Sequence, residues 1–212
     1  MPKRSSFGIC DACGVRKGKG AMVAHLTSCL PAHPCAGAST GSELLLLLRA
    51  QASGSPIFWL DLAVKPEGKL KDVDRFLRRI WLECCGHMSK FYGSAHRKVS
   101  MNTKVREAFG SAADRLGYVY DFGSSTELNV ALSGAVEGSA KGVVRLVARN
   151  EAPTWPCDVC DEPATVVCAQ CLYEGKGFCC TAHAPSHDCG DEMLLPVANS
   201  PRMGVCGYTG EA

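Results

Sequence analysis

Residues 69–85, KLKDVDRFLRRIWLECC, decide the fold class, because they carry the clearest helical pattern of the chain. Apolar residues recur there at steps of three and four, which is the period of a helix with one buried face. That stripe consists of Leu70, Val73, Leu77, Ile80 and Cys84, widened by Phe76 and Trp81. The stretch therefore predicts one long amphipathic helix, with Gly86 just past its end.

Segments typical of β-strands lie on both sides of this helix. They are short, rich in β-branched and aromatic residues, and bounded by turn residues. They cover residues 43–50, 57–64, 89–93, 116–123, 126–136 and 142–150, with a short helix expected near 103–109. This order predicts an α+β core with a mostly antiparallel sheet and the long helix on one face.

Cysteine is the anomaly of the composition. The 212 residues include 14 cysteines and six histidines, and no apolar segment follows the basic start. The longest aliphatic run, Leu44–Leu48, is too short to cross a bilayer. These features predict a cytoplasmic protein without membrane association, in which thiols stay reduced and clustered cysteines bind metal.

The charge divides the chain into three parts. Residues 1–40 carry a net charge of +4, residues 41–150 carry +5, and residues 151–212 carry −7. The segment at 31–42 is rich in Pro, Ala, Gly and Ser and reads as a linker. We therefore expect a zinc finger at 1–34, the α+β core at 42–150, and a double-zinc module with a C-terminal tail at 154–212.

The first part has the ligand spacing of a C2HC zinc finger. Two residues separate Cys10 from Cys13, and His25 and Cys29 lie one helical turn apart. Three thiolates and one imidazole suit tetrahedral zinc. His33 or Cys35 remains an alternative to Cys29 as the fourth ligand.

The same segment lacks the side chains of a sequence-reading DNA finger. Counted back from His25, the base-contact positions fall on Ala24, Ala21 and Gly18, none of which can bond to a base edge. The basic residues Arg16, Lys17 and Lys19 can only hold phosphates. The finger is therefore predicted to contact nucleic acid without sequence preference, or to contact protein.

The last part contains eight metal ligands, enough for two closed zinc sites. They are Cys157, Cys160, Cys168, Cys171, Cys180, His183, His187 and Cys189. Two arrangements are open. In the interleaved one, Cys157 and Cys160 share an ion with Cys180 and His183, and the remaining four share the other; in the sequential one, neighbouring pairs combine. Cys179 is an alternative to Cys180 as the zinc ligand.

This spacing resembles the cross-braced zinc fingers of the MYND and B-box types. The resemblance covers roughly 35 residues and implies protein binding rather than catalysis. Six thiolates around two zinc ions add negative charge to an acidic segment, which would repel nucleic acid.

Residues 70–92 and the YVYDFG segment at 118–123 resemble the uncharacterised Ri-plasmid open-reading-frame-three family. That resemblance covers about residues 42–150 and implies an α+β fold. Typical members continue the YDFG segment with an acidic residue, a tryptophan and a histidine, whereas this chain has Ser124, Thr126 and Leu128.

One set of residues outside the zinc motifs has catalytic chemistry. Cys85, His87 and Asp121 supply a thiol, a base and an acid. A helix C-terminus disfavours a thiolate, and Cys84 lies on the apolar stripe, so both cysteines are expected to be buried and inert.

The sequence thus predicts a non-enzymatic, zinc-stabilised adaptor with about three zinc ions per chain. Its partner is expected to be a protein, with non-specific nucleic-acid contact through the basic N-terminal half. The alternatives are a nucleic-acid-associated regulator of a mobile element, and an enzyme that uses Cys85, His87 and Asp121.

Overall fold

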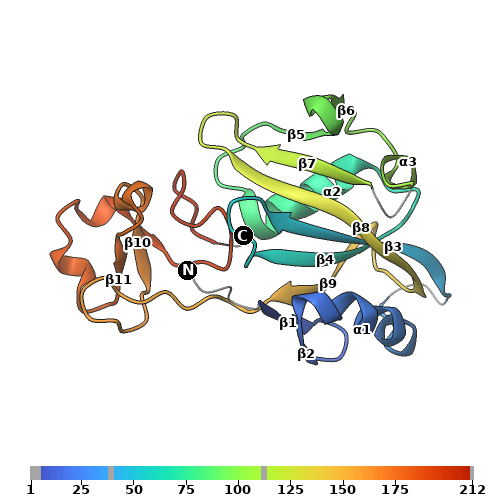
Figure 1. Ribbon diagram of the computed structural model, residues 1–212, viewed down its shortest axis with the longest axis horizontal. Coiled ribbons are helices and arrows are strands. Elements are labelled where there is room, and N and C mark those ends of the chain that lie inside the picture. The colour runs from blue at the N-terminus through green and yellow to red at the C-terminus, as the bar shows by residue number, and fades with distance from the viewer. Residues whose placement is uncertain (1–5, 38–40, 111–113, 211–212) are drawn as a thin grey trace. The chain divides into compact units, whose positions relative to one another are not determined.

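The computed structural model describes residues 6–37, 41–110 and 114–210, and these form two compact units. The first unit comprises residues 1–76, 88–120 and 127–151, and the second comprises residues 77–87, 121–126 and 152–212. Part of the predicted linker, residues 38–40, lies outside the described residues, as do the ends of the predicted finger and tail modules. Each unit has its own sheet (Figure 1).

The first unit is built on a large antiparallel sheet. Among the described residues it has nine strands in the order β2-β1-β9-β4-β3-β8-β7-β5-β6. The strands are β1 (Phe7–Cys10), β2 (Arg16–Gly18), β3 (Glu43–Ala52), β4 (Trp59–Val64), β5 (Ser89–Tyr92), β6 (Lys98–Val99), β7 (Arg115–Tyr120), β8 (Thr126–Gly138) and β9 (Val144–Asn150). The mixed α/β class and the antiparallel sheet are confirmed.

The finger segment is part of this sheet. β1 pairs with β2 on one side and with β9 on the other, where Cys10 lies opposite Ala148. Helix α1 (Lys19–Ala32) buries Met22, Leu26 and Leu30 against apolar residues of β3, β4, β8 and β9. The finger therefore shares a hydrophobic core with the sheet.

β1 approaches its neighbours too closely for any side chain at Gly8. A Cβ atom at that position would meet the carbonyl oxygen of Arg149 and lie 2.5 Å from the ring of Trp59. Trp59 is buried in turn, and its Nε1 donates to Ser6 Oγ at 2.6 Å. Glycine is thus required where the finger meets the sheet.

The prediction of one long amphipathic helix is wrong. The α-helix α2 covers only Leu70–Leu77 and continues as a five-residue π-helix, Arg78–Leu82. The wider turn ends where the Glu83 N–H donates to the Arg78 carbonyl, five residues back, at 2.8 Å. The short helix expected near 103–109 is α3 (Val105–Ala108), and a 3₁₀ turn covers Ser94–His96.

Helix α2 lies against the β5–β7 part of the sheet. Asp74 Oδ1 accepts hydrogen bonds from Ser89 Oγ at 2.5 Å and from Tyr118 Oη at 2.8 Å. Leu70, Val73 and Phe76 on the helix are buried, which is the amphipathic face that the sequence predicted.

The second unit has little regular structure. Its sheet has the order β11-β10-β12, with β10 (Val166–Cys168), β11 (Phe178–Cys179) and β12 (Leu194–Pro196). 3₁₀ turns cover Cys171–Glu174, Ala184–Ser186 and Asp191–Met193. Its buried apolar cluster consists of Val167, Phe178 and Met203, with Trp155 stacked on Phe178 at 4.9 Å between ring centroids.

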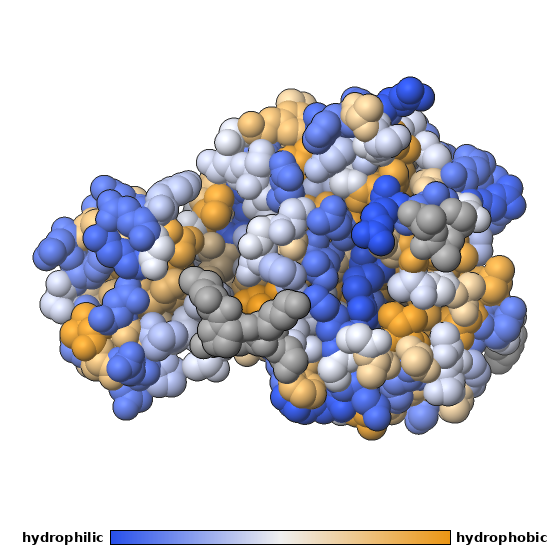
Figure 2. Space-filling view, in the orientation of Figure 1, coloured by the Kyte–Doolittle hydropathy of each residue, from blue (hydrophilic) through white to orange (hydrophobic). Residues whose placement is uncertain are grey.

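The surface of the chain is mixed. On the face seen in Figure 2, the hydrophobic patches are small and are separated by hydrophilic residues. Within the described residues, none of the helices has the length and apolar character needed to span a bilayer.

Candidate metal centres

The described part of the chain contains four groups of cysteine and histidine side chains that could hold a metal ion. In each group, one potential ligand atom per residue lies within 4.8 Å of all the others. The groups are Cys10, Cys13, His25 and Cys29; Cys157, Cys160, Cys180 and His183; Cys168, Cys171, His187 and Cys189; and Cys84, Cys85, His87 and Cys206. We call these the finger, knuckle, hairpin and turn clusters, in that order.

The finger cluster is built by a tight turn and by helix α1. The turn after β1 is closed by hydrogen bonds from Gly14 N to the Cys10 carbonyl and from Cys10 N to the Val15 carbonyl. Gly14 adopts a φ of +72°, which favours glycine. His25 and Cys29 lie one turn apart on α1, so both side chains face the cysteine turn.

The sulfur separations fit a tetrahedral ion better than they fit a disulfide. Zn–S bonds of about 2.3 Å give an S···S edge of about 3.8 Å in a tetrahedron. Cys10 Sγ lies 3.8 Å from Cys29 Sγ in the finger cluster, and Cys160 Sγ lies 3.7 Å from Cys180 Sγ in the knuckle cluster. The donors present therefore have the number, chemistry and spacing that zinc requires.

The two alternatives to Cys29 as the fourth ligand differ in their distance from the finger cluster. His33 Nδ1 lies 3.4 Å from Cys29 Sγ, beside the finger cluster. Cys35 lies outside the cluster, with its N–H bonded to Ser139 Oγ.

The knuckle and hairpin clusters follow the interleaved arrangement. Cys157 and Cys160 meet Cys180 and His183, and the hairpin cluster takes the remaining four predicted ligands. Cys179 is buried outside both groups, with its Sγ 3.9 Å from His187 Nδ1. Strand β11 ends at Cys179, and of the two neighbouring sulfurs only that of Cys180 joins the knuckle cluster.

The turn at Cys157 repeats the turn at Cys10. Cys157 N donates to the Glu162 carbonyl, and Asp161 N donates to the Cys157 carbonyl. These are the same offsets as in the finger, and Asp161 has a φ of +60° where the finger has Gly14. The same local geometry therefore presents a cysteine pair in both units.

Backbone N–H groups lower the pKa of one thiol in the knuckle cluster and of one thiol in the hairpin cluster. The N–H groups of Cys180 and Val159 lower the pKa of Cys157 to about 6. Burial opposes this effect at Cys168, yet the Cys171 N–H and the His187 side chain bring its pKa to about 7. In contrast, Cys189 raises the pKa of Cys171 to about 12, because neighbouring thiols share protons. A divalent ion would replace those protons.

Two of the three basic residues expected to hold phosphates are engaged within the first unit. Arg16 forms a two-point ion pair with Glu151, at 2.6 and 2.8 Å, and its guanidinium lies 3.8 Å from the Phe7 ring centroid. Lys19 Nζ donates to Gln51 Oε1 at 2.8 Å and to the Pro56 carbonyl at 3.1 Å. Lys17 is exposed, as are Ala21 and Ala24.

The turn cluster was missed by the sequence interpretation. Cys84 was expected on the buried stripe, but it is half-buried, and Cys85 is exposed, because the helix ends before both residues. The available signal was the Cys-Cys-x-His spacing together with Cys206, which no predicted site used. The distance of Cys206 along the chain hid the connection.

The three residues of the enzyme alternative, Cys85, His87 and Asp121, lie close together, but they do not have the geometry of a catalytic triad. His87 Nε2 lies 2.9 Å from Cys85 Sγ and 3.5 Å from Asp121 Oδ2. In a triad, the acid orients the ring through the nitrogen opposite the nucleophile, whereas here both groups approach Nε2. Cys206 and Cys84 also raise the pKa of Cys85 to about 12, which disfavours a nucleophilic thiolate.

Comparisons with known proteins define no family for this chain. No family model matches it, and no curated protein matches it. A solved structure of a protein of unknown function from Methanosarcina mazei Go1 is similar over 51% of this chain and 68% of that chain, with 17% sequence identity and a TM-score of 0.42.

Proposed function

We propose that this protein is a zinc-stabilised binding protein, in which the finger, knuckle and hairpin clusters each hold a structural zinc ion. The observation that carries the proposal is that each of these clusters supplies four protein ligands. Four protein ligands fill a tetrahedral site and leave no position for a substrate or an activated water. Such ions stabilise a fold and leave function to the surface around them.

A protein partner is supported by the surface of the second unit. Val159 lies between two knuckle ligands, and Tyr173 follows a hairpin ligand. Val159 is 67% exposed and Tyr173 is 79% exposed, so an apolar and an aromatic side chain are available on the surface close to the ligands in the chain. With zinc bound, the thiolates leave this segment strongly acidic, so a basic protein surface with apolar pockets is the favoured partner.

The second candidate is non-specific binding of nucleic acid, as part of a regulator of a mobile element. Exposed Lys17 and the positive charge of residues 1–150 support it. The contacts of Arg16 and Lys19 count against it, because those cations are already paired or hydrogen-bonded.

One crosslinking experiment separates these two candidates. A photoreactive amino acid replaces Tyr173 in one variant and Lys17 in another, and both are irradiated in the cells that make the protein. The proposal expects a defined protein adduct from position 173 that disappears when Val159→Asp is added. Nucleic-acid adducts from position 17, with none from position 173, would favour the second candidate. Elemental analysis of the same preparations measures the zinc content.

A further inference from the structure

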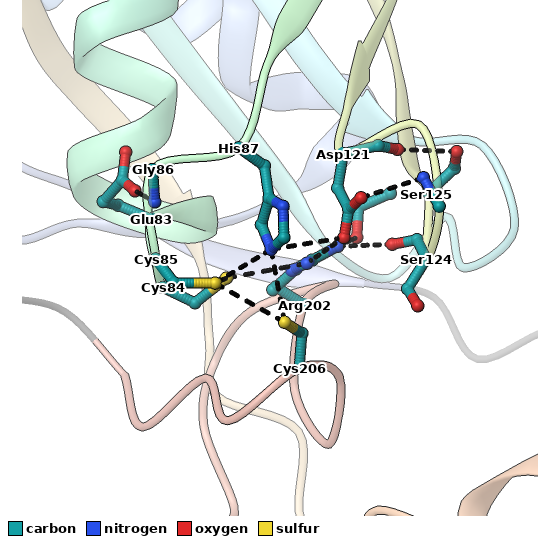
Figure 3. A network of polar contacts seen from close by, with 12 residues as sticks. Glu83, Cys84, Cys85, Gly86, His87, Asp121, Ser124, Ser125, Arg202 and Cys206 are labelled. Carbon is teal, nitrogen blue, oxygen red and sulfur yellow. Dashed lines mark hydrogen bonds and ion pairs between the residues drawn. The ribbon is translucent and has the colours of Figure 1, made fainter.

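We infer that the turn cluster, Cys84, Cys85, His87 and Cys206, is a fourth zinc site in the second unit. This inference goes beyond the proposed function, which uses only the other three clusters. The side chains converge from two segments, one following the π-helix and one close to the C-terminus (Figure 3).

The separations of the ligand atoms support an ion rather than a disulfide. Cys85 Sγ lies 3.7 Å from Cys84 Sγ and 3.6 Å from Cys206 Sγ, close to the tetrahedral edge of about 3.8 Å. A disulfide would need about 2.05 Å. His87 Nε2 lies 2.9 Å from Cys85 Sγ and 3.2 Å from Cys206 Sγ. An ion at the centre would move the ring outward, to a nitrogen–sulfur edge of about 3.5 Å.

The segment that carries three of the ligands is fixed by Glu83. Its Oε1 accepts from the Gly86 N–H at 2.7 Å, and its Oε2 accepts from Arg78 at 2.6 Å. Gly86 has a φ of +80°, so the chain reverses between Cys85 and His87. This turn presents both thiols and the imidazole on one side.

A buried arginine, which is also paired with Asp121, donates a hydrogen bond to one ligand of this site. Three thiolates and one Zn²⁺ leave a net charge of −1. Arg202 is fully buried, and its Nη2 lies 2.7 Å from Asp121 Oδ2 and 3.5 Å from Cys84 Sγ. Its Nη1 donates to the Ser124 carbonyl at 2.5 Å and to Thr126 Oγ1 at 3.2 Å. Hydrogen bonds of this kind orient metal ligands and stabilise thiolates.

The backbone of Cys206, the ligand from the C-terminal segment, adopts the left-handed conformation. Cys206 has a φ of +51°, and the following Gly207 has a φ of +65°. The left-handed region costs a non-glycine residue free energy, and such residues persist where the surroundings compensate for it. A metal bond to Cys206 would provide that compensation.

Exposure distinguishes this site from the other three. Both Cys85 and Cys206 are exposed, whereas each of the other clusters contains at least one fully buried cysteine and no more than one exposed ligand. A competing chelator reaches exposed thiolates directly. We therefore expect the ion of the turn cluster to leave first, and to exchange while the other three remain bound.

Zinc stoichiometry tests the inference with the full-length protein. The native chain is expected to carry about four zinc ions and Cys206→Ser about three, whereas Cys35→Ser, whose sulfur lies outside all four clusters, keeps about four. His87→Gln repeats the test from the other segment. With a coloured chelator, the fastest phase of release should disappear in Cys206→Ser and persist in Cys35→Ser.

Cobalt substitution gives a second measure. Co²⁺ in a site with three thiolates absorbs through sulfur-to-metal charge transfer, and Cys206→Ser should remove about a quarter of that absorbance. About three ions in the native protein, with no change in either variant, would overturn the fourth site and leave the proposed function intact. A native protein that binds an ion in the turn cluster but none in the finger, knuckle and hairpin clusters would overturn the proposed function instead.

Discussion

Arg202 and Asp121 form a buried ion pair, in which Nη2 of the arginine lies 2.7 Å from Oδ2 of the aspartate. The arginine and the Gly123 N–H hold the pKa of Asp121 below its usual value, so the carboxylate stays ionised at neutral pH. The pair joins the segment after β7 to the C-terminal tail within the second unit.

We expect Arg202→Met to lower the free energy of unfolding of the second unit by about 3–5 kcal/mol, because it leaves a buried carboxylate without its partner. Urea unfolding of the zinc-loaded protein measures the loss. Lys104→Met, which breaks an exposed pair with Glu67, is the control and should cost no more than about 1 kcal/mol. Equal effects of the two substitutions would contradict the role of Arg202.

Gly8→Ala should destabilise the first unit by about 1–3 kcal/mol, because its methyl group would overlap Trp59 and the Arg149 carbonyl. Gly20→Ala is the matched control. It lies in α1 with open space around it and should be neutral or stabilising by up to about 1 kcal/mol. Thermal unfolding compares them, and a neutral Gly8→Ala would argue against the close packing of β1.

Cys180→Ser should remove about one zinc ion per chain, whereas Cys179→Ser, one residue earlier, should remove none. The physical reason is that only the Cys180 sulfur faces the knuckle cluster. Elemental analysis of both variants under identical loading tests whether Cys180, rather than Cys179, is the ligand. Zinc loss from Cys179→Ser alone would show that the ligands are grouped differently.

Complete zinc removal should affect the two units unequally. The second unit has a small apolar cluster around Val167, Phe178 and Met203, so its sheet should lose protection against hydrogen exchange. The first unit has a larger core and should keep slow exchange in β3 and β4. Hydrogen exchange with and without chelator measures both. Uniform loss of protection in β4 would mean that metal also maintains the main sheet.

The parts of the fold that follow from local pattern were accessible from the sequence. Each strand expected between residues 43 and 150 has a counterpart in the sheet, because alternation and turn residues are local signals. The end of α2 at Leu77 was not accessible, because the apolar periodicity continues through the π-helix that follows it. β1 and β2 were missed because the spacing of Cys10 and Cys13 drew attention to metal rather than to pairing.

The candidate sites show the same distinction. Three predicted ligand sets coincide with three groups that lie close in space, since their residues are near one another in the chain. That these groups bind zinc stays a prediction. The turn cluster depends on Cys206, more than 100 residues from its neighbours along the chain, and no local spacing reveals such a partner.

The pairing of β1 with β9 has a consequence for biosynthesis. Gly8 of β1 is made before β3, β4, β7 and β8, whereas its partner Asn150 of β9 is made only after them. Until then β1 can pair only with β2, and its other edge is a row of unpaired backbone groups. β1 thus precedes the strands β2 to β9 in the chain but completes its pairing only when β9 has been made, and the nascent chain carries an open β-edge over that interval.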